Sequence, residues 1–249
     1  MIKLLMNLAK IIVATFIALL FNSCKHDIDF DFGQESIKGN GNVITENRNL
    51  SGFEKVTVNR ALDCEIIQSN TFKVVVEADE NLIKGIETYV ENGTLKITSK
   101  YNNYHNVASK KITVYLPIIS GLESSSGSNL TNKGVIKSNN IYLKSSSAAD
   151  MNVVIESDKI TVETTSGSEI KVKGKAIALE TASSSGSSID AEELLVNEVN
   201  AQSSSGSETV VNPILKLSAK ASSGSSIGYI KKPNQIDIEE SSGGSVGKE

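Results

Sequence analysis

Apolar and polar residues alternate along the second half of the chain in a pattern that returns every 18 to 21 residues. Each return is centred on a short tract of small residues, most often SSSGS. A fixed period of this length is typical of a solenoid, in which each coil buries its apolar face against its neighbours. The seven tracts are Ser124–Ser128, Ser145–Ala149, Thr164–Ser168, Ser183–Ser187, Ser203–Ser207, Ala221–Ser225 and Glu240–Gly244.

Positions in each coil are numbered here from the fourth residue of its tract, which is position 0 and is Gly in six tracts and Ala148 in one. Positions −7, −5 and +3 are mostly apolar, as in Ile160, Val162 and Ile170. Positions −4 and +2 are polar and variable. Side chains two residues apart share one face of a strand. The pattern therefore predicts that the odd positions face inward and the even positions face solvent.

The same parity, carried through the tract, places the serine at position −1 on the inner face. Ser is found there in all seven coils, for example at Ser126 and Ser185. Buried hydroxyls need hydrogen-bond partners, which stacked serines would supply. Glycine at position 0 is expected to provide the backbone angles of a tight corner. A corner glycine can also shift the parity, which would turn part of the tract outward.

Residues 39–120 are strand-like but less regular. Asn92-Gly93 between two β-type runs predicts a hairpin, and Asp79–Lys84 favours a single helical turn. Tyr101–Ser109 is interpreted as an exposed loop. At the other end, residues 243–249 are interpreted as a flexible, charged end that protects the last open strand edge.

The N-terminus has the features of a secretory signal. Lys3 and Lys10 flank the apolar run Ile11–Phe21, which is shorter than the about 20 residues of a spanning helix. The sequence Phe21-Asn22-Ser23-Cys24 resembles a bacterial lipobox, which implies acylation of Cys24 and cleavage before it. The alternatives are an uncleaved anchor or plain secretion. The acidic stretch after Cys24 resembles a surface-export signal and would form a solvated tether.

Composition narrows the possible functions. The chain has no Trp and 5% aromatic residues, which disfavours a large helical core. The absence of Trp also disfavours a sugar-stacking cleft, although Tyr142 and Tyr229 are available to stack on a sugar. Its net charge is −4, and loss of residues 1–23 with two lysines makes it −6. This charge provides no basic surface for nucleic acid. The second cysteine, Cys64, is in phase with apolar residues, so we expect an inert core thiol.

No catalytic, cofactor-binding or metal-binding motif is recognised. The two histidines are His26 in the tether and His105 in a Tyr/Asn-rich segment, and neither has metal-ligand spacing. At position +2, Asp150 and Glu169 are expected to stack in adjacent coils. Paired carboxylates suit Ca²⁺ binding or glycosidase chemistry, whereas a solvated face also explains them.

Several motifs before the repeats resemble one family. They resemble the head GIN domain family, also described as a putative auto-transporter adhesin domain. The resemblance covers about residues 39–246. The resemblance implies an all-β, right-handed helix-like fold and transfers no binding residues. The motifs are Gly39-Asn40-Gly41, Leu50–Val56, Leu62–Ile66, Val74–Asn81, Ile86–Val90 and Asn92–Ile97, followed by the Ser-Gly repeats.

Together these observations predict an all-β protein with a right-handed parallel β-solenoid of 19–20-residue coils and an N-terminal signal helix. The expected segments are a signal peptide (1–23), a tether (24–38), an N-terminal β region (39–120) and the solenoid (121–249). We expect a non-catalytic lipoprotein, anchored in the outer membrane through Cys24 on the surface or periplasmic side, that binds a polymer, glycan or envelope protein. The alternatives are a carbohydrate-active enzyme on the same scaffold and a purely structural envelope module.

Overall fold

A computed structural model describes residues 35–249, so the expected signal helix and Cys24 lie outside the described residues. The described part is all-β apart from one helical turn, α2 (Glu80–Ile83), as the sequence predicts. The N-terminal strands are β1 (Glu35–Lys38), β2 (Val43–Arg48), β3 (Lys55–Val58), β4 (Asp63–Gln68), β5 (Lys73–Asp79), β6 (Ile86–Glu91), β7 (Thr94–Ser99), β8 (Tyr101–His105) and β9 (Lys110–Leu116).

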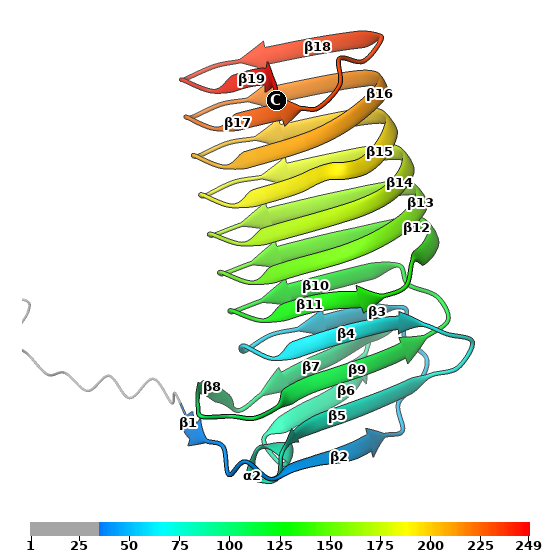
Figure 1. Ribbon diagram of the computed structural model, residues 1–249, viewed down its shortest axis with the longest axis vertical. Coiled ribbons are helices and arrows are strands. Elements are labelled where there is room, and N and C mark those ends of the chain that lie inside the picture. Colours follow the sequence, from blue (N-terminus) through cyan, green and yellow to red (C-terminus); the bar gives the residue numbers. More distant parts are fainter. Residues whose placement is uncertain (1–34) are drawn as a thin grey trace, which may run out of the picture. The chain divides into compact units, whose positions relative to one another are not determined.

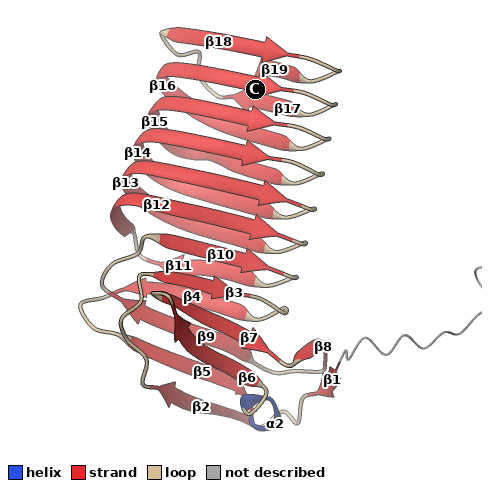
Figure 2. Cartoon of the chain, turned by 180° about the vertical axis from the view of Figure 1, so that it is seen from behind, coloured by secondary structure: helices blue, strands red, loops and turns tan. Residues whose placement is uncertain are grey.

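The Ser-Gly repeats form a parallel β-solenoid of about seven turns, which confirms the expected layered fold (Figure 1). Each coil is a flattened loop with a tight turn at one edge and a rounded bend at the other (Figure 2). Several strands run through the bend and so belong to two faces. These are the long strands β12 (Ile136–Ser146), β13 (Asp150–Thr165), β14 (Glu169–Ser183), β15 (Ser188–Ser203) and β16 (Glu208–Ala221). The short strands β10 (Gly121–Ser125), β11 (Asn129–Lys133), β17 (Ser226–Tyr229), β18 (Gln235–Glu240) and β19 (Ser245–Lys248) each lie on one face.

The predicted inward columns form the core. Ile160, Val162 and Ile170 are all fully buried, and their register partners in the next coil are Leu179, Thr181 and Ile189. Each apolar side chain therefore packs against its counterpart one coil away. Only the last coil departs from this pattern, because Ile238 is 41% exposed with no following coil to cover it.

The prediction for the serine at position −1 is wrong. Ser185 is exposed and has a φ of 56°, and the following Gly186 has a φ of 67°. Two consecutive left-handed residues are characteristic of a type I′ turn, which reverses the chain within two residues. This turn shifts the parity, so that positions −3 and +1 point inward while −1 points to solvent. The buried serines are thus Ser183 and Ser187.

A serine hydroxyl at position +1 holds five of the seven tight turns together, and the other two turns have Ala149 and Gly244 at this position. Ser187 Oγ donates to the carbonyl of Ser184 at 2.8 Å and accepts from the Ser184 N–H at 3.2 Å. The N–H to hydroxyl bond recurs at Ser128, Ser168, Ser207 and Ser225. Successive turns are also joined, because the Gly186 N–H donates to the Ser205 carbonyl of the next coil at 3.1 Å.

Two further layers extend the stack beyond the Ser-Gly repeats. Strands β3 and β4 pair in parallel with β10 and β11, and on their other side with β7 and β9. Arg60 and Ala61, between β3 and β4, have φ values of 59° and 55°. They make the same left-handed turn as Ser-Gly, and the Ala61 N–H donates to the Ser126 carbonyl.

The N-terminal end of the stack is closed by antiparallel strands. β6 pairs with β7 through the predicted hairpin at Asn92-Gly93, and β5 lies between β9 and β2. The buried carboxylate of Asp79, at the end of β5, accepts backbone N–H bonds from Gly41, Ala108 and Ser109 at 2.8–2.9 Å. This one side chain therefore joins two loops to the cap.

Two local predictions are wrong. Tyr101–His105, expected in a loop, is strand β8, which pairs with β1 in the segment interpreted as tether. The C-terminal residues, expected to be flexible, include strand β19, which pairs with β17 because Val246 continues the +3 column above Ile227. Within residues 35–249, no helix is long and apolar enough to cross a membrane.

Candidate functional site

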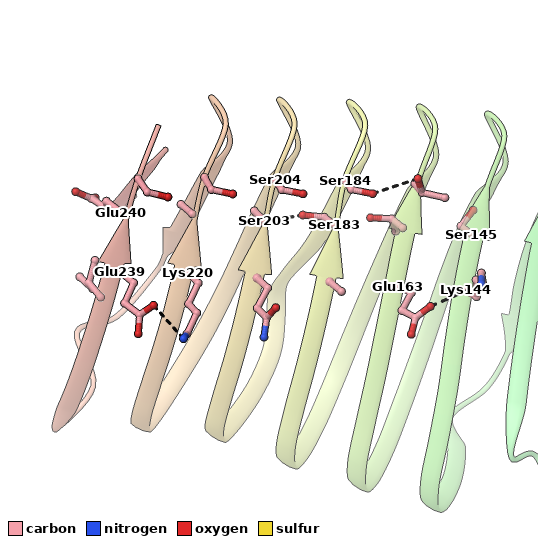
Figure 3. Close-up of a pocket in the computed structure, with 18 residues that line it drawn as sticks. Lys144, Ser145, Glu163, Ser183, Ser184, Ser203, Ser204, Lys220, Glu239 and Glu240 are labelled. Carbon is pink, nitrogen blue, oxygen red and sulfur yellow. Dashed lines mark hydrogen bonds and ion pairs between the residues drawn. The ribbon is translucent and has the colours of Figure 1, made fainter. Parts of the chain in front are cut away.

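A groove of about 900 Å³ runs across the strands beside the tight turns (Figure 3). We call it the tip groove. It crosses six coils from β12 to β18. One wall is the outward position −4, the other is the outward position −2, and the floor is position −3. The first wall consists of Lys144, Glu163, Ala182, Gln202, Lys220 and Glu239, and the second includes Thr165, Ser184, Ser204, Ser222 and Ser241.

The charges on the first wall compensate one another. Lys144 Nζ lies 3.7 Å from Glu163 Oε2, and Lys220 Nζ lies 2.9 Å from Glu239 Oε2. Between these two pairs the wall is uncharged, because Ala182 and Gln202 occupy the middle coils. The groove thus has a neutral centre between two ion pairs, and at Ala182 the wall is lowest.

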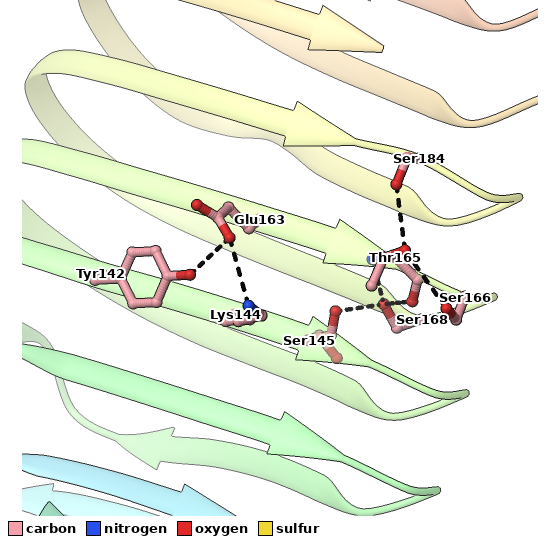
Figure 4. A network of polar contacts seen from close by, with 8 residues as sticks. All are labelled: Tyr142, Lys144, Ser145, Glu163, Thr165, Ser166, Ser168 and Ser184. Carbon is pink, nitrogen blue, oxygen red and sulfur yellow. Dashed lines mark hydrogen bonds and ion pairs between the residues drawn. The ribbon is translucent and has the colours of Figure 1, made fainter. Parts of the chain in front are cut away.

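Tyr142 supports one of these ion pairs from position −6 (Figure 4). Its hydroxyl donates to Glu163 Oε2 at 2.7 Å, so the carboxylate is held by Lys144 and Tyr142 together. Burial and the hydrogen bond to Glu163 raise the pKa of Tyr142. The phenol therefore remains a donor, and the orientation of Glu163 on the wall is fixed.

The second wall is a ladder of hydroxyl groups. Ser184 Oγ donates to Thr165 Oγ1 in the neighbouring coil at 3.2 Å (Figure 4). A hydroxyl residue occupies position −2 in all seven coils. These groups are partly exposed and retain hydrogen-bonding capacity toward a ligand, since each hydroxyl has one donor and two acceptor sites.

The hydroxyls under the floor serve packing. Ser183 Oγ lies 2.8 Å from Ser203 Oγ and 2.9 Å from both Ser207 Oγ and Thr209 Oγ1. All four side chains are buried. They satisfy one another inside the turn, so a ligand in the groove meets the backbone of position −3 and not these hydroxyls.

The acidic column at position +2 is formed as predicted. Asp150 is the register partner of Glu169, Glu169 that of Ser188, and Ser188 that of Glu208. Asp150 and Glu169 are exposed, and neither lines the tip groove. Within residues 35–249, no group of three or more His, Cys, Asp or Glu residues could hold a metal ion.

The remaining singled-out residues lie apart from the groove. Cys64 is 3% exposed in the core, and burial, with the neighbouring Glu65 and Asp63 carboxylates, raises the pKa of its thiol. It is therefore an unreactive thiol, as expected. His105 is exposed on β8. Cys24 and His26 lie outside the described residues.

Sequence reasoning missed the groove because it followed position −1. The available signal was the hydroxyl residue at position −2, which is as regular as the serine at −1. A second signal was the wall sequence Lys-Glu-Ala-Gln-Lys-Glu at position −4. Neither indicates a groove until the parity of the turn is known.

The described fold has known counterparts. The family model "Putative auto-transporter adhesin, head GIN domain" matches residues 52–233. A "putative adhesin" from Bacteroides fragilis NCTC 9343 has a TM-score of 0.79 at 19% identity, covering 86% of this chain and 100% of that one. A "putative lipid binding protein" from Parabacteroides distasonis ATCC 8503 gives 0.72 at 22% identity, with the same coverage. A "putative adhesin" from Parabacteroides merdae ATCC 43184 gives 0.68 at 18%, covering 86% and 99%.

At these identities the likeness supports the fold alone. The comparison with curated proteins found no match.

Proposed function

Because the chain belongs to the head GIN domain family, we propose that it is a non-catalytic cell-envelope protein whose β-solenoid binds a linear, uncharged glycan along the tip groove. The observation that carries this proposal is the continuous path of the groove across six coils. A compact small molecule would fill only part of such a site, whereas an extended polymer uses its whole length.

The repeat of the groove suits a repeating ligand. Parallel strands in neighbouring coils are about 4.8 Å apart. A chain lying along the stack therefore meets an equivalent hydroxyl of the second wall, such as Ser184 or Ser204, at each step of about 4.8 Å. A glycan presents donors and acceptors repeatedly along its length, which matches this ladder.

The charges favour a neutral ligand. The lysines of the wall, Lys144 and Lys220, are already paired with Glu163 and Glu239. Binding of a polyanion such as nucleic acid depends on lysines and arginines that neutralise its phosphates. The neutral centre at Ala182 and Gln202 instead accepts an uncharged segment without desolvating a lone charge.

The proposal includes the expected placement in the cell. Residues 1–23 would be removed as a signal peptide, Cys24 acylated, and residues 24–38 would tether a right-handed solenoid to the outer membrane. Residues 39–120 would form the N-terminal β region and residues 121–249 the repeats. The lipobox-like sequence before Cys24 supports this anchoring, and the adhesin names of the family and neighbours agree with an envelope location.

A matched pair of variants tests the groove. Ala182→Trp places an indole in the lowest part of the wall, whereas Ala178→Trp places it on the same strand, β14, four residues outside the groove. On an array of neutral polysaccharides, the parent chain and Ala178→Trp should bind alike. Ala182→Trp should weaken binding at least about tenfold, which corresponds to about 1.4 kcal/mol. Equal glycan binding by both variants would show that the binding site does not lie in the tip groove.

The same assay separates the alternatives. Release of reducing ends, lost in Asp150→Asn or Glu169→Gln, would establish a carbohydrate-active enzyme and contradict the non-catalytic proposal. Absence of any glycan signal together with a stable crosslinked envelope protein would support a structural module.

A further inference from the structure

The rounded edge opposite the tight turns has an exposed apolar cluster, which we call the edge patch. It consists of Ile177, Leu195, Ile214 and Leu215, which are 55%, 41%, 43% and 44% exposed. They belong to the consecutive strands β14, β15 and β16, and lie about midway between successive tight turns along the chain. These strands round the bend at the edge opposite the tight turns (Figure 1). Contiguous exposed apolar side chains of this kind mark interaction surfaces.

The register shows that these side chains are neighbours. Ala176, Val196 and Pro213 are partners in successive coils. Ile177 follows Ala176, Leu195 precedes Val196, and Ile214 follows Pro213. The apolar groups therefore lie around one column across three layers and form a single surface.

The geometry of the bend does not require apolar residues. In the preceding coil the partner of Ala176 is Ser157, followed by Asp158. One coil earlier the partner of Ser157 is Ser138, followed by Asn139. The same backbone thus carries polar residues in the earlier coils, and the change to Ile177 and Leu215 is a property of this part of the chain.

Lysines without ion-pair partners surround the patch. Among residues 35–249, the salt bridges do not include Lys175, Lys216, Lys231 or Lys232. Lys175 is the register partner of Leu195, Lys216 follows Leu215, and Lys231 and Lys232 form the bend of the next coil. All four are exposed. Of the acids nearby, Glu193 is paired with Lys173 and Glu156 with Lys137. This leaves Asp158, Glu192 and Glu198 against the four lysines.

We propose that the edge patch rests on an anionic phospholipid surface, with its apolar side chains at the headgroup boundary and its lysines against phosphates. Apolar residues bordered by lysines are the composition of surfaces that lie on such membranes. The lysines without ion-pair partners favour an anionic lipid surface over a purely apolar partner, because an apolar partner would leave Lys175 and Lys216 without counter-charges.

The chain joins the described fold at β1, on the edge of the tight turns and opposite the edge patch (Figure 1), so the contact requires a tether that reaches across the width of the solenoid. Ten residues lie between Cys24 and Glu35, and the eleven residue steps from Cys24 to Glu35 span about 36–40 Å when fully extended. If Cys24 is acylated as proposed above, the solenoid stays within this reach of the bilayer, which raises the effective concentration of the patch. The tight turns and the tip groove would then point away from the lipid (Figure 2).

Position-specific labelling tests the contact in the full chain. In a Cys24→Ser background, Cys64 is buried, so a new exposed cysteine is the reactive thiol. Ile177→Cys and, as control, Gln202→Cys on the groove wall would each carry an environment-sensitive fluorophore. With vesicles of phosphatidylglycerol and phosphatidylcholine, we expect a blue shift at residue 177, quenching by lipid-attached quenchers, and no change at residue 202. This readout does not depend on acylation or on glycan binding.

Companion variants identify the forces. Leu195→Ser with Leu215→Ser should abolish the blue shift at residue 177, and Lys216→Gln with Lys231→Gln and Lys232→Gln should make it several-fold weaker at moderate salt. Three results would overturn the proposal. They are unchanged fluorescence of the label at residue 177 when the protein sediments with the vesicles, equal blue shifts of the labels at residues 177 and 202, and no binding of the protein to the vesicles. A shift that grows with protein concentration in the absence of vesicles would assign the edge to a second copy of the chain and would also overturn it.

Discussion

The hydroxyl oxygens of Ser183 and Ser203 lie 2.8 Å apart inside the tight turns of neighbouring coils. Both are buried, and Ser183 also contacts Ser207 and Thr209 at 2.9 Å. The Ser-Gly tract therefore contributes a polar network to the interior as well as a turn to the surface. Because a buried hydroxyl is stable only when bonded, this network depends on each of its members.

Ser183→Ala should destabilise the protein by about 1–3 kcal/mol, because it removes one hydroxyl and leaves buried partners incompletely bonded. Urea denaturation would measure the change. The control is Ser188→Ala on the same coil, which lies on the outward +2 column and should change stability by no more than about 0.5 kcal/mol. Equal effects of the two variants would show that the network contributes nothing.

Ser185→Val should cost about 1–2 kcal/mol, since a β-branched residue is strained at a φ of 56°. Ser185→Asn should be neutral or stabilising, because Asn-Gly is the preferred sequence of a type I′ turn. Thermal unfolding of the two variants tests the turn directly. A tolerated valine together with a destabilising asparagine would contradict the assigned conformation.

Asp79→Asn should cost about 2–3 kcal/mol at neutral pH, because it replaces a carboxylate that accepts three backbone N–H bonds. Burial alone would raise the pKa of Asp79, but the bonds from Ser109, Gly41 and Ala108 outweigh it and hold the pKa below its usual value.

The stability from Asp79 is therefore fully present above its unfolded pKa of about 3.9 and is lost as the pH falls from there through the lower folded pKa. Urea denaturation of the parent and Asp79→Asn should show a constant difference from pH 7 to about pH 5 and a shrinking one below about pH 4. As the control, Asp158→Asn removes an exposed carboxylate and should change stability at neutral pH by no more than about 0.5 kcal/mol. A difference that grows on acidification would refute this role.

Ile160→Ala should cost about 2–5 kcal/mol, as expected for a fully buried isoleucine. Ile238→Ala should cost less than half as much, because no coil covers that side chain. Denaturant midpoints of this pair measure how much each layer gains from the next. Similar losses would mean that the last coil is covered in solution.

Cys24→Ala should abolish metabolic palmitate labelling, because Cys24 is the acceptor proposed from the lipobox-like sequence. Cys64→Ala is the control, since its thiol is buried, and it should leave labelling intact. Labelling that persists in Cys24→Ala would disprove the anchor.

The layered part of the fold was predictable because its information is local. Inward residues such as Ile160 and Val162 recur at a fixed distance from each Gly, and the period of two within a strand fixes their side. The layer of β3 and β4 was not recognised, because Arg60-Ala61 replaces Ser-Gly. There the surrounding backbone hydrogen bonds, including the one from the Ala61 N–H to the Ser126 carbonyl, hold the left-handed turn. Arg and Ala are not residue types that predict such a turn.

The candidate site was less predictable for a related reason. Whether Ser184 or Ser185 faces solvent depends on the number of residues that the turn consumes, and Ser-Gly sequences are compatible with several turns. The groove also combines residues from six coils, so its existence depends on how the ridges of positions −4 and −2 stand relative to each other. Only the outward direction of position −4 followed from the alternation.

The order of the layers differs from the order of the chain. Strands β3 and β4 come first in sequence, yet both of their neighbouring layers, β7 with β9 and β10 with β11, are synthesised later. During synthesis from the N-terminus, β3 and β4 therefore have no neighbouring layer to pair with until β9 is complete, at about residue 116. After that point each new coil adds to a finished template. Growth is thus delayed once and then sequential, and removing whole coils from the C-terminus, but not strands from the N-terminus, should leave a foldable remainder.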